Sequence, residues 1–329
     1  MTMNSKSPTS HNQNFKIINQ KQPIENSRYQ QSQQRWEQVT TSLELTPVPL
    51  HVDIELTNNC DVRCVMCERK FMRRKFGMMS MALFKRIVDD CENSGVESVK
   101  LNLWGESLLH KKLLDMVQYA KENSSLILQF NTNANRLTGE ISRGLVTAGL
   151  DKLAISVDGV SEETYRKVRK GGSLKRVTDN IEALLDIKKA STSVLPVVTL
   201  QIIAMTETKH EIDTFVETWQ DKVDCVSVTN VFTTDKSHNE IGKLSLRRES
   251  PKKLKPCPQL WQRLSILWDG TVTVCCNDYD GELSIGTIQK NSVAELWNCA
   301  KLKQFRRLHR DLEFSDLLCK KCENIIAYK

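Results

Sequence analysis

Three cysteines lie close together in the pattern C-x3-C-x2-C: Cys60, Cys64 and Cys67. Thiolates at this spacing can ligate three irons of a [4Fe–4S] cluster, which is held by cysteine sulfur. The next cysteine, Cys91, belongs to a predicted helix, so one iron would stay open to bind a small molecule and pass it an electron. Structural zinc sites usually pair their cysteines as C-x2-C sets, and a single triad does not fit that pattern.

A second group of cysteines lies in the last quarter of the chain. It comprises C-P-Q-L-W beginning at Cys257, G-x4-C from Gly270 to Cys275, and C-K-K-C from Cys319 to Cys322. Four thiolates suit one fully ligated [4Fe–4S] cluster or one structural zinc ion, and spacing does not separate the two. Cys276 is an alternative ligand to Cys275, although G-x4-C favours Cys275.

The remaining cysteines have a different expected role. Buried thiols usually behave as small apolar residues, which is the expectation for Cys91 and Cys299. Cys225 begins a predicted strand and could face a substrate cavity, where its thiol could return a hydrogen atom to a substrate radical. Cys276 is a second candidate for that role.

Composition limits the classes of function. The chain has 329 residues, a net charge of +7 and eleven cysteines. There is no secretory signal, and the longest apolar stretch, from 194 to 205, is too short to span a bilayer. We therefore expect a cytoplasmic protein whose cysteines serve metal binding or catalysis.

Basic residues cluster at several places, including 69–75 directly after the cysteine triad. Three interpretations are a solvated surface, an anionic substrate, and an acidic electron donor docking near the first cluster. Aromatic residues are not interleaved with the basic ones as a stacking platform for nucleic acid would require.

The alternation of strands and helices predicts an α/β fold. The expected strands are His51–Thr57, Val99–Trp104, Leu126–Thr132, Lys152–Val157, Val197–Ile203 and Cys225–Val231. Helical patterns fall between them, which indicates right-handed crossovers and a parallel sheet. The pattern fits a partial (β/α)6 TIM-like barrel over residues 47–235. Residues 1–46 are polar, rich in Gln, Asn and Ser, and are expected to form a disordered or loosely docked tail.

Residues 236–329 are expected to form a small iron–sulfur extension. Asp269-Gly270 between two apolar runs is a strong hairpin signal, and a helix with Val293, Leu296 and Trp297 on one face follows. In β/α barrels the chemistry gathers at the carboxyl ends of the strands. The cysteine triad follows the first expected strand, and polar residues end the next three.

The triad after a first strand resembles the signature of the radical S-adenosylmethionine (radical SAM) superfamily. The resemblance implies that Cys60, Cys64 and Cys67 ligate a [4Fe–4S] cluster whose open iron chelates S-adenosylmethionine. It also implies cofactor contacts from Met66, Gly105, Glu106, Asn131, Asn133, Ser156 and Asp158. Gly105 and Glu106 match the end of the family's GGE motif, but Trp104 replaces its first glycine and Ser107 the common proline.

Cysteine, hairpin, helix and C-x2-C resemble the SPASM extension of this family in its shorter, single-cluster form, called twitch. The resemblance implies one auxiliary [4Fe–4S] cluster held by Cys257, Cys275, Cys319 and Cys322, with a zinc site as the alternative. It further implies an enzyme that cleaves S-adenosylmethionine reductively and abstracts a hydrogen atom from its substrate, with an acidic electron donor such as flavodoxin or ferredoxin as partner.

The substrate is expected to be a small molecule, such as a sugar, a cyclitol or a nucleotide-linked sugar, because the polar tail does not suit a peptide-recognition domain. Oxidation with help from the auxiliary cluster is the favoured reaction. The alternatives are a peptide- or protein-modifying maturase, a radical epimerase, an RNA-modifying enzyme, and a non-catalytic iron–sulfur or zinc scaffold.

Overall fold

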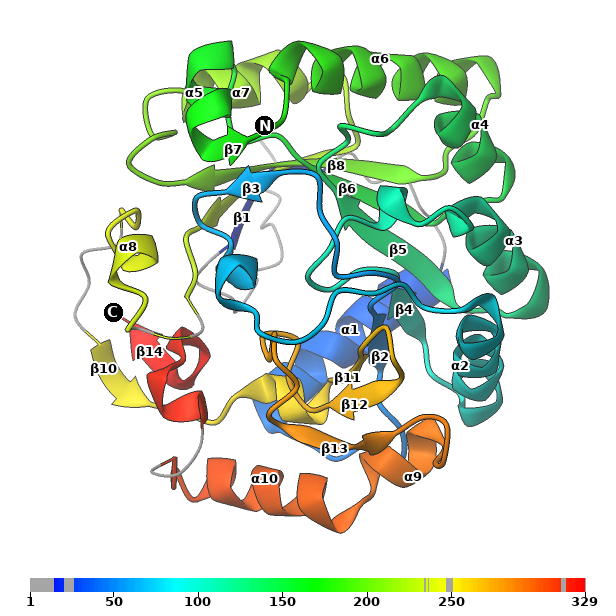
Figure 1. The fold of residues 1–329 in the computed structure, drawn as a ribbon, viewed down its shortest axis with the longest axis vertical. Coiled ribbons are helices and arrows are strands. Elements are labelled where there is room, and N and C mark those ends of the chain that lie inside the picture. The colour runs from blue at the N-terminus through cyan, green and yellow to red at the C-terminus, as the bar shows by residue number, and fades with distance from the viewer. Residues whose placement is uncertain are drawn as a thin grey trace, which may run out of the picture.

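The computed structural model describes residues 15–20, 27–233, 235, 237–246, 251–314 and 318–328. Within these ranges the chain forms a curved sheet with an arc of helices on its outer face. Figure 1 shows α2, α3, α4 and α6 following one another around strands β4, β5, β6 and β8. Among the described residues, no helix is long and apolar enough to cross a membrane.

The main sheet contains the six strands predicted from sequence. Its strands are, in spatial order, β1 (Phe15–Gln20), β9 (Cys225–Asn230), β8 (Val197–Ala204), β6 (Lys152–Ser156), β5 (Ile127–Thr132), β4 (Ser98–Lys100), β2 (His51–Ile54), β11 (Arg263–Ile266), β12 (Thr271–Thr273) and β13 (Ser284–Thr287). All neighbours from β9 to β11 are parallel. The sheet is open between β1 and β13, so the α/β class and the partial barrel are confirmed.

Two smaller strand pairs lie outside this sheet. They are β3 (Arg63–Cys64) with β7 (Arg169–Lys170), and β10 (Pro251–Leu254) with β14 (Ile326–Tyr328), both antiparallel. The helices are α1 (Ser27–Ser42), α2 (Met81–Ser94), α3 (Leu113–Asn123), α4 (Gly139–Thr147), α5 (Glu162–Val168), α6 (Leu174–Ala190), α7 (Ile212–Trp219), α8 (Asn239–Gly242), α9 (Val293–Trp297) and α10 (Ala300–Arg310), with short 3-10 turns η1 (Glu68–Phe71), η2 (Ser107–Leu109), η3 (Pro258–Trp261), η4 (Leu318–Lys321) and η5 (Glu323–Ile325).

Alternation along the strands separates an apolar face from a polar one. Leu128 and Phe130 of β5 are buried in the same core as Leu153 and Ile155 of β6. The intervening residues, such as Asn131, are half-buried. Because successive strand side chains point to opposite faces, the helices cover the apolar face and the polar face lines the inside of the barrel.

Helix α2 begins and ends at residues that favour the ends of helices. The Ser80 side chain accepts a hydrogen bond from the Leu83 N–H at the start of α2, and Gly95 ends the helix with a φ of +82°. Serine is a favoured N-cap and glycine tolerates the left-handed conformation. Phe84, Ile87, Val88 and Cys91 form one stripe along this helix and are fully buried, which confirms the helix expected at Cys91 and its packing role.

Residues 15–20 and 27–42 of the tail, expected to be disordered or loosely docked, form a strand and a helix. β1 pairs with β9, and α1 docks through Val39, which is buried, and Trp36, whose ring lies edge-on to His51. A few apolar residues on one face hold this helix. The surrounding Gln and Ser residues outnumber them, so the composition of the segment is polar. Residues 1–14 and 21–26 lie outside the described part of the chain.

The C-terminal segment continues the barrel sheet. β11 pairs in parallel with β2, from Arg263 opposite His51 to Ile266 opposite Ile54. β12 then pairs antiparallel with β11, and Gly270 in the turn has a φ of +88°, so the Asp269-Gly270 hairpin is confirmed. The division into units 47–235 and 236–329 stays a prediction, since the two share one sheet.

Candidate functional site

The cysteine triad lies in the loop that leaves the carboxyl end of β2. Cys64 belongs to β3, opposite Arg169 of β7, and Cys67 precedes η1. The Cys67 N–H donates a hydrogen bond to the Cys64 carbonyl at 3.2 Å, which draws this part of the loop into a tight turn. All three side chains are half-buried, and each of the eleven cysteines is a free thiol.

The triad offers a donor set that suits an iron–sulfur cluster. Burial raises the pKa of Cys60 and of Cys64 to about 11. A Cys64 thiolate would raise the pKa of Cys60, and a Cys67 thiolate would raise that of Cys64, because like charges repel. Thiolates so placed require a cation, which the irons of a cluster supply. The residues therefore fit the cluster that their spacing predicts.

Gly105 and Glu106 follow β4 and reach back to the triad loop. A Cβ atom on Gly105 would lie 2.1 Å from the Thr57 carbonyl oxygen and 2.7 Å from that of Asn59, so only glycine fits this close approach. The Glu106 N–H donates to the Asn59 carbonyl oxygen at 2.8 Å. The motif is thereby joined directly to the residue that precedes Cys60.

The carboxylate of Glu106 is buried on the barrel rim. It accepts hydrogen bonds from the Thr132 hydroxyl and the Asn133 N–H, both at 2.8 Å, and from the Leu108 N–H at 3.1 Å. Burial nevertheless raises the pKa of Glu106 to about 7. A buried carboxyl at the end of a barrel strand can accept hydrogen bonds from an ammonium group.

Asn133 connects β5 to the triad loop. Its side-chain amide donates to Asp61 at 2.9 Å and lies 3.9 Å from the Cys60 sulfur. Asn131, in contrast, is half-buried on the inner face of the barrel, and its backbone N–H donates to the Asn102 side chain. Of these two predicted residues, the structure brings Asn133 beside a cysteine of the triad.

Asp158 follows β6 and is paired with an arginine that the sequence analysis missed. Asp158 is fully buried, with a φ of +52°, and contacts Arg169 at 2.6 Å. Arg169 is itself buried, and one of its N–H groups lies 3.5 Å from the Cys64 sulfur. Ser156, at the end of β6, is half-buried. Arg169 lies in the basic run R-K-V-R-K, where nothing in the sequence marks it as the buried member.

Met66 lies on the other side of the triad loop. It packs, half-buried, against a small apolar cluster that includes Val168, Met205, Val231 and Ile241. This cluster joins the loop to the carboxyl end of β9. Met66 is therefore at the rim, on the same loop as the triad, and its contact with the cofactor stays a prediction.

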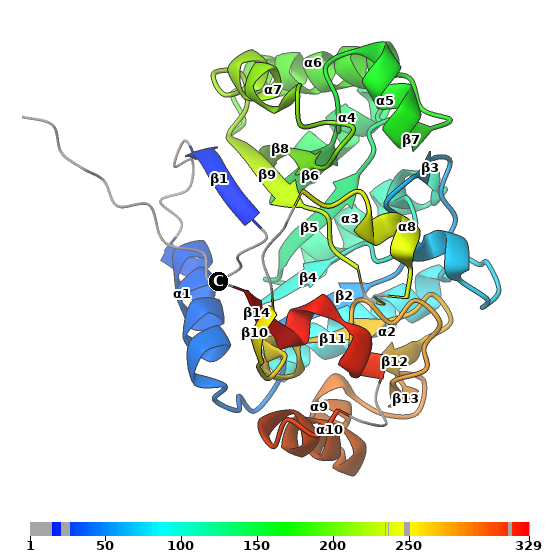
Figure 2. The same cartoon turned by 90° about the vertical axis from the view of Figure 1, so that its left-hand side faces the viewer.

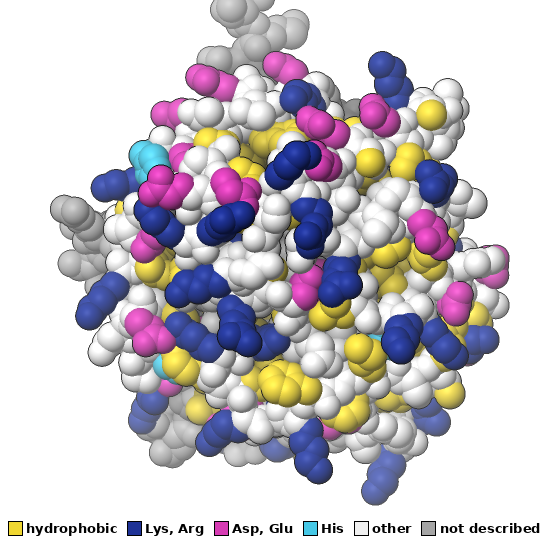
Figure 3. Space-filling view, turned by 45° about the horizontal axis from the view of Figure 1, so that its top comes forward, with side chains coloured by type: hydrophobic (Ala, Val, Ile, Leu, Met, Phe, Trp, Pro, Cys, Tyr) yellow, Lys and Arg dark blue, Asp and Glu magenta, His cyan; other side chains and the backbone are white. Residues whose placement is uncertain are grey.

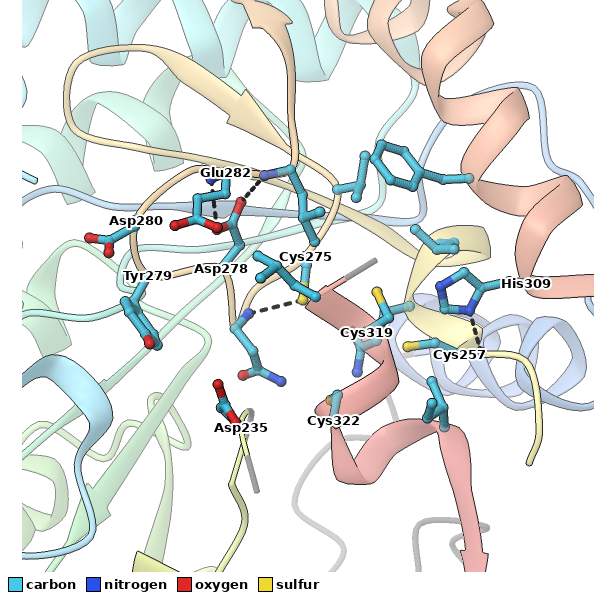
Figure 4. A pocket seen from close by; sticks show the side chains of 18 of the residues that line it. Asp235, Cys257, Cys275, Asp278, Tyr279, Asp280, Glu282, His309, Cys319 and Cys322 are labelled. Atoms are coloured by element: carbon cyan, nitrogen blue, oxygen red, sulfur yellow. Dashed lines mark hydrogen bonds between the residues drawn. The ribbon is translucent and has the colours of Figure 1, made fainter. Parts of the chain in front are cut away.

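The second cysteine set surrounds one cavity of about 210 Å³. Its lining includes all four predicted ligands, Cys257, Cys275, Cys319 and Cys322, and their thiols face a common space (Figure 4). Cys276 is not among the lining residues; its thiol lies 4.0 Å from the Gln259 side chain. Within the described ranges, no three His, Cys, Asp or Glu side chains form a ready-made site for a single metal ion.

Burial and backbone contacts shape this cavity. Burial raises the pKa of Cys257 to about 12 and that of Cys319 to about 11. The Cys257 N–H donates to His309 Nδ1 at 3.1 Å, and the Asn277 N–H donates to the Cys275 sulfur at 3.3 Å. One buried and three half-buried thiols around one cavity fit a fully ligated cluster.

Aromatic side chains lie between the two cysteine sets. The Tyr279 ring, which borders the second cavity, meets Trp104 edge-on at 5.6 Å. His238 stacks on Phe71 at 3.7 Å, and its Nδ1 lies 3.1 Å from the buried Glu68 carboxylate. Sequence analysis missed these residues because η1, α8 and the 275–282 loop are far apart along the chain.

Cys225 lies at the wrong end of the barrel for the suggested hydrogen donor. It is the first residue of β9, pairs with Thr199 and is 8% exposed. Nearby, Lys152 donates a hydrogen bond to the Tyr29 hydroxyl of α1. Figure 2 shows α1 and β1 on the opposite side of the strands from β3 and α8. A thiol here is remote from the triad because the triad follows the carboxyl ends.

Comparison with known proteins identifies the two parts of the chain. Residues 54–218 match the model of the radical SAM superfamily, and residues 257–323 match that of the SPASM iron–sulfur cluster-binding domain. A probable GTP 3′,8-cyclase of Methanothermobacter thermautotrophicus is 25% identical over 57% of this chain and 59% of its own length. A GTP 3′,8-cyclase of Limosilactobacillus fermentum is 28% identical over 44% of this chain and 45% of its own length. The chain thus spans about half the length of the curated relatives it matches.

Solved structures share the fold. BtrN in complex with AdoMet and 2-DOIA has a TM-score of 0.57 at 17% identity, over 84% of this chain and 94% of that chain. SuiB of Streptococcus suis, bound to its precursor peptide SuiA, has a TM-score of 0.64 at 13% identity, over 92% of this chain and 76% of that chain. The superfamily model covers half of the sequence, and the SPASM model covers most of the remaining cysteines. This chain therefore belongs to the radical SAM superfamily and carries a C-terminal SPASM domain.

Proposed function

We propose that this protein oxidises a small molecule, of the sugar or cyclitol class, by removing one hydrogen from a carbon atom and one from the hydroxyl group that the carbon carries. When bound, the first cluster and S-adenosylmethionine supply the radical that abstracts a hydrogen atom, and the auxiliary cluster supplies an electron acceptor. The observation that carries the proposal is the contact between the segment after the triad and the loop that borders the second cavity: the Arg73 and Arg74 N–H groups donate to Asp280, and Trp104 meets Tyr279.

The first cluster would be held by Cys60, Cys64 and Cys67. Glu106 is placed to accept hydrogen bonds from the amino group of S-adenosylmethionine, since its carboxylate is buried beside the triad loop. Arg169 is a buried cation beside Cys64 and is placed to bind the carboxylate of the same ligand. Met66, Gly105, Asn131, Asn133, Ser156 and Asp158 complete the proposed cofactor site.

The auxiliary cluster would be held by Cys257, Cys275, Cys319 and Cys322. The shared cavity, which Cys276 does not line, supports this set. A four-thiolate zinc site has the same donor set, and iron analysis separates the two.

Glu68 and His238 are placed to handle the proton of a substrate hydroxyl. The carboxylate of Glu68 favours the tautomer with hydrogen on Nδ1 of His238, which leaves the lone pair on Nε2. That nitrogen can accept the hydroxyl proton as the carbonyl forms. The stacked ring of Phe71 restrains the imidazole plane.

Two comparisons support a small substrate. The chain matches 94% of BtrN, whose structure contains 2-DOIA, and the relatives in sequence are named GTP 3′,8-cyclases. A peptide substrate is the second candidate, favoured by the higher TM-score to SuiB bound to its precursor peptide. We place the enzyme in the cytoplasm, because its eleven free thiols and proposed clusters suit a reducing compartment.

The test is an anaerobic assay with the reconstituted full chain and a panel of cyclitols, sugars, nucleotides and peptides. Formation of 5′-deoxyadenosine, together with a product lighter by two hydrogens, is the expected result for a cyclitol or sugar. A product that keeps both hydrogens in ordinary water, and takes up one deuterium when the reaction runs in deuterated water, would establish an epimerase instead. A modified peptide would transfer the proposal to the second candidate.

A further inference from the structure

A buried ring nitrogen beside the second cysteine cavity has no hydrogen-bond partner in the described part of the chain. This atom is Nε2 of His309, a residue that is 1% exposed. His309 lines the cavity together with Cys257, Cys275, Cys319 and Cys322. Of the described residues that line it, His309 is the one with a buried side-chain nitrogen or oxygen that lacks a partner. Because an unpaired buried polar group costs free energy, this nitrogen points to a group that binds in the cavity.

Helix α10 holds His309 against the cavity. Phe305, Arg306 and His309 are buried, and their spacing places them on one face of the helix. The Arg306 guanidinium donates hydrogen bonds to the Leu260 carbonyl at 2.9 Å and to the Trp297 carbonyl at 3.0 Å. Leu260 belongs to η3, the turn that directly follows the first cysteine of the second set. The helix is thereby fixed to the segment that supplies a proposed cluster ligand.

A backbone hydrogen bond determines which ring nitrogen of His309 carries the hydrogen. The Cys257 N–H donates to Nδ1 at 3.1 Å, so Nδ1 is an acceptor and carries no hydrogen. A neutral imidazole has one N–H and one acceptor nitrogen, and the hydrogen therefore lies on Nε2. The Phe314 ring meets the imidazole at 73°, with 4.8 Å between the ring centroids, which restrains the orientation further. Figure 4 shows the ring beside Cys257 and Cys319.

The same tautomer argues against His309 as a metal ligand. A histidine that binds a metal uses an unprotonated nitrogen and almost always donates a hydrogen bond through the other one. In His309 the other nitrogen accepts a hydrogen bond, so ligation through Nε2 would leave the imidazole with no hydrogen on either nitrogen. The four cysteines already supply the thiolates of a fully ligated cluster. We therefore expect His309 to contact a sulfur atom and not an iron atom.

A donor inside the cavity acts on a cluster more strongly than a charge at the surface does. The reduction potential of an iron–sulfur cluster depends on hydrogen bonds to its sulfur atoms and on its exposure to solvent. Figure 3 shows Lys, Arg, Asp and Glu side chains on one face of the molecule, where water and salt weaken their influence. A buried N–H group acts instead at a low local dielectric constant, which strengthens its electrostatic effect.

We propose that the Nε2–H group of His309 donates a hydrogen bond to a sulfur atom of the auxiliary cluster and thereby raises the reduction potential of that cluster. In the proposed oxidation the cluster accepts one electron from the substrate radical, and its charge becomes more negative by one unit. The N–H dipole stabilises this added charge, and the proton stays on His309. The inference rests on the proposed function, because it requires an iron–sulfur cluster, and not zinc, at the second cysteine set.

The experiment measures the midpoint potential of the auxiliary cluster without interference from the first one. The full-length protein with all three triad cysteines replaced by alanine is reconstituted anaerobically, and a redox titration is followed by EPR. His309→Asn is the test variant, because its side-chain oxygen can replace Nδ1 as the acceptor for the Cys257 N–H but offers no donor in the place of Nε2. His309→Gln is the matched variant, since its longer amide can place an N–H near the position of Nε2.

A third variant controls for packing. Phe305→Leu changes a side chain that lies on the same helix and lines the same cavity but has no polar atom. We expect His309→Asn to lower the ratio of reduced to oxidised cluster about tenfold at a given potential, which corresponds to about 59 mV for one electron. His309→Gln should recover most of this shift, and Phe305→Leu should keep the original potential.

A measurement on the unaltered cavity makes the test independent of the folding of these variants. Pulsed EPR of the reduced auxiliary cluster, in protein that contains isotopically labelled histidine, should show a weak nitrogen coupling. The coupled proton should exchange in deuterated water. A strong coupling, as for nitrogen bound to iron, would make His309 a ligand and overturn the proposal.

Other outcomes would also overturn the proposal. An unchanged potential in His309→Asn, or the absence of any nitrogen coupling, would show that the N–H does not reach the cluster. Equal shifts in all three variants would attribute the change to packing. Zinc at the second cysteine set, or a triad variant that binds no iron, would instead refute the auxiliary cluster of the proposed function.

Discussion

The guanidinium of Arg169 points one N–H at the sulfur of Cys64, 3.5 Å away. On its other side the same group contacts Asp158 at 2.6 Å, and the Asp158 carboxylate also accepts the Ile203 N–H. The arginine is thus fixed between the end of β6 and the triad loop. Coulombic attraction to Asp158 counters burial and raises the pKa of Arg169, so this buried cation stays charged.

Removing that cation should strongly destabilise the protein. Arg169→Met leaves Asp158 buried without its partner, a change that typically costs about 3–5 kcal/mol. The double variant R169M/D158N removes both charges and should recover part of the loss. Urea unfolding of the cluster-free protein measures both effects. Equal stability of the single variant and the wild type would show that the pair is not held in solution.

The triad prediction concerns iron content. The reconstituted wild type should carry about eight irons per chain, four for each cluster. Replacing Cys60, Cys64 and Cys67 together by alanine should leave about half of the iron and abolish cleavage of S-adenosylmethionine. Iron analysis and chromatography of 5′-deoxyadenosine provide the readouts. Stoichiometric zinc beside a single cluster in the wild type would contradict the auxiliary-cluster assignment.

Cys275 and Cys276 form a matched pair of neighbours. Cys275→Ala should remove about four irons, because its thiol borders the shared cavity, whereas Cys276→Ala should retain them. Cys257→Ala and Cys319→Ala should still cleave S-adenosylmethionine but form no oxidised product. Full turnover by Cys319→Ala would deny the second site a redox role, and insolubility of that variant would mark the site as structural.

Gly105 offers a steric test of the rim. Gly105→Ala sets a methyl group against the carbonyls of Thr57 and Asn59, and such overpacking typically costs about 1–3 kcal/mol. Gly242→Ala is the control, since a Cβ there has no neighbour within 4 Å. Chemical unfolding of the two variants should differ by that amount. A stable Gly105→Ala protein with normal cofactor binding would show that this backbone can move aside.

Glu106 predicts a pH dependence. The folded protein keeps this carboxyl protonated up to about pH 7, whereas an unfolded chain loses the proton near about pH 4.3. Between these two pH values the folded state therefore binds more protons than the unfolded state. The stability that the Glu106 carboxyl contributes is lost as the pH rises through this range. Glu106→Gln should flatten that part of the stability curve. If the stability of the wild type and of Glu106→Gln changed equally with pH over this range, the raised pKa of Glu106 would be contradicted.

Much of the fold could be predicted from sequence because local patterns determined it. The six barrel strands are apolar and bounded by turns, and Asp269-Gly270 set the hairpin. Helix α1 could not be predicted, since Trp36 and Val39 become informative only once the amino ends of the strands provide a surface. Tertiary burial outweighs a polar composition there.

The site was predictable where ligands are close in sequence or share a motif. The triad and C-K-K-C are of that kind, and Gly105 and Glu106 follow from their position after a strand. Arg169, Glu68 and His238 could not be found in this way. Arg169 depends on Asp158, and Glu68 and His238 depend on each other. In each case the partner comes from another element, and a charged residue in a charged run gives no sign of such pairing.

The parallel pairing of β11 with β2 has a consequence for biosynthesis. Translation delivers β2 (His51–Ile54) long before β11 (Arg263–Ile266), so the nascent barrel leaves one edge of β2 unpaired until the SPASM segment is being made. A prematurely terminated product ending near residue 235 would retain all three cysteines of the triad and a bare strand edge, and bare edges recruit other chains into aggregates. Protection of the barrel edge is thereby linked to synthesis of the segment that carries the second cysteine set.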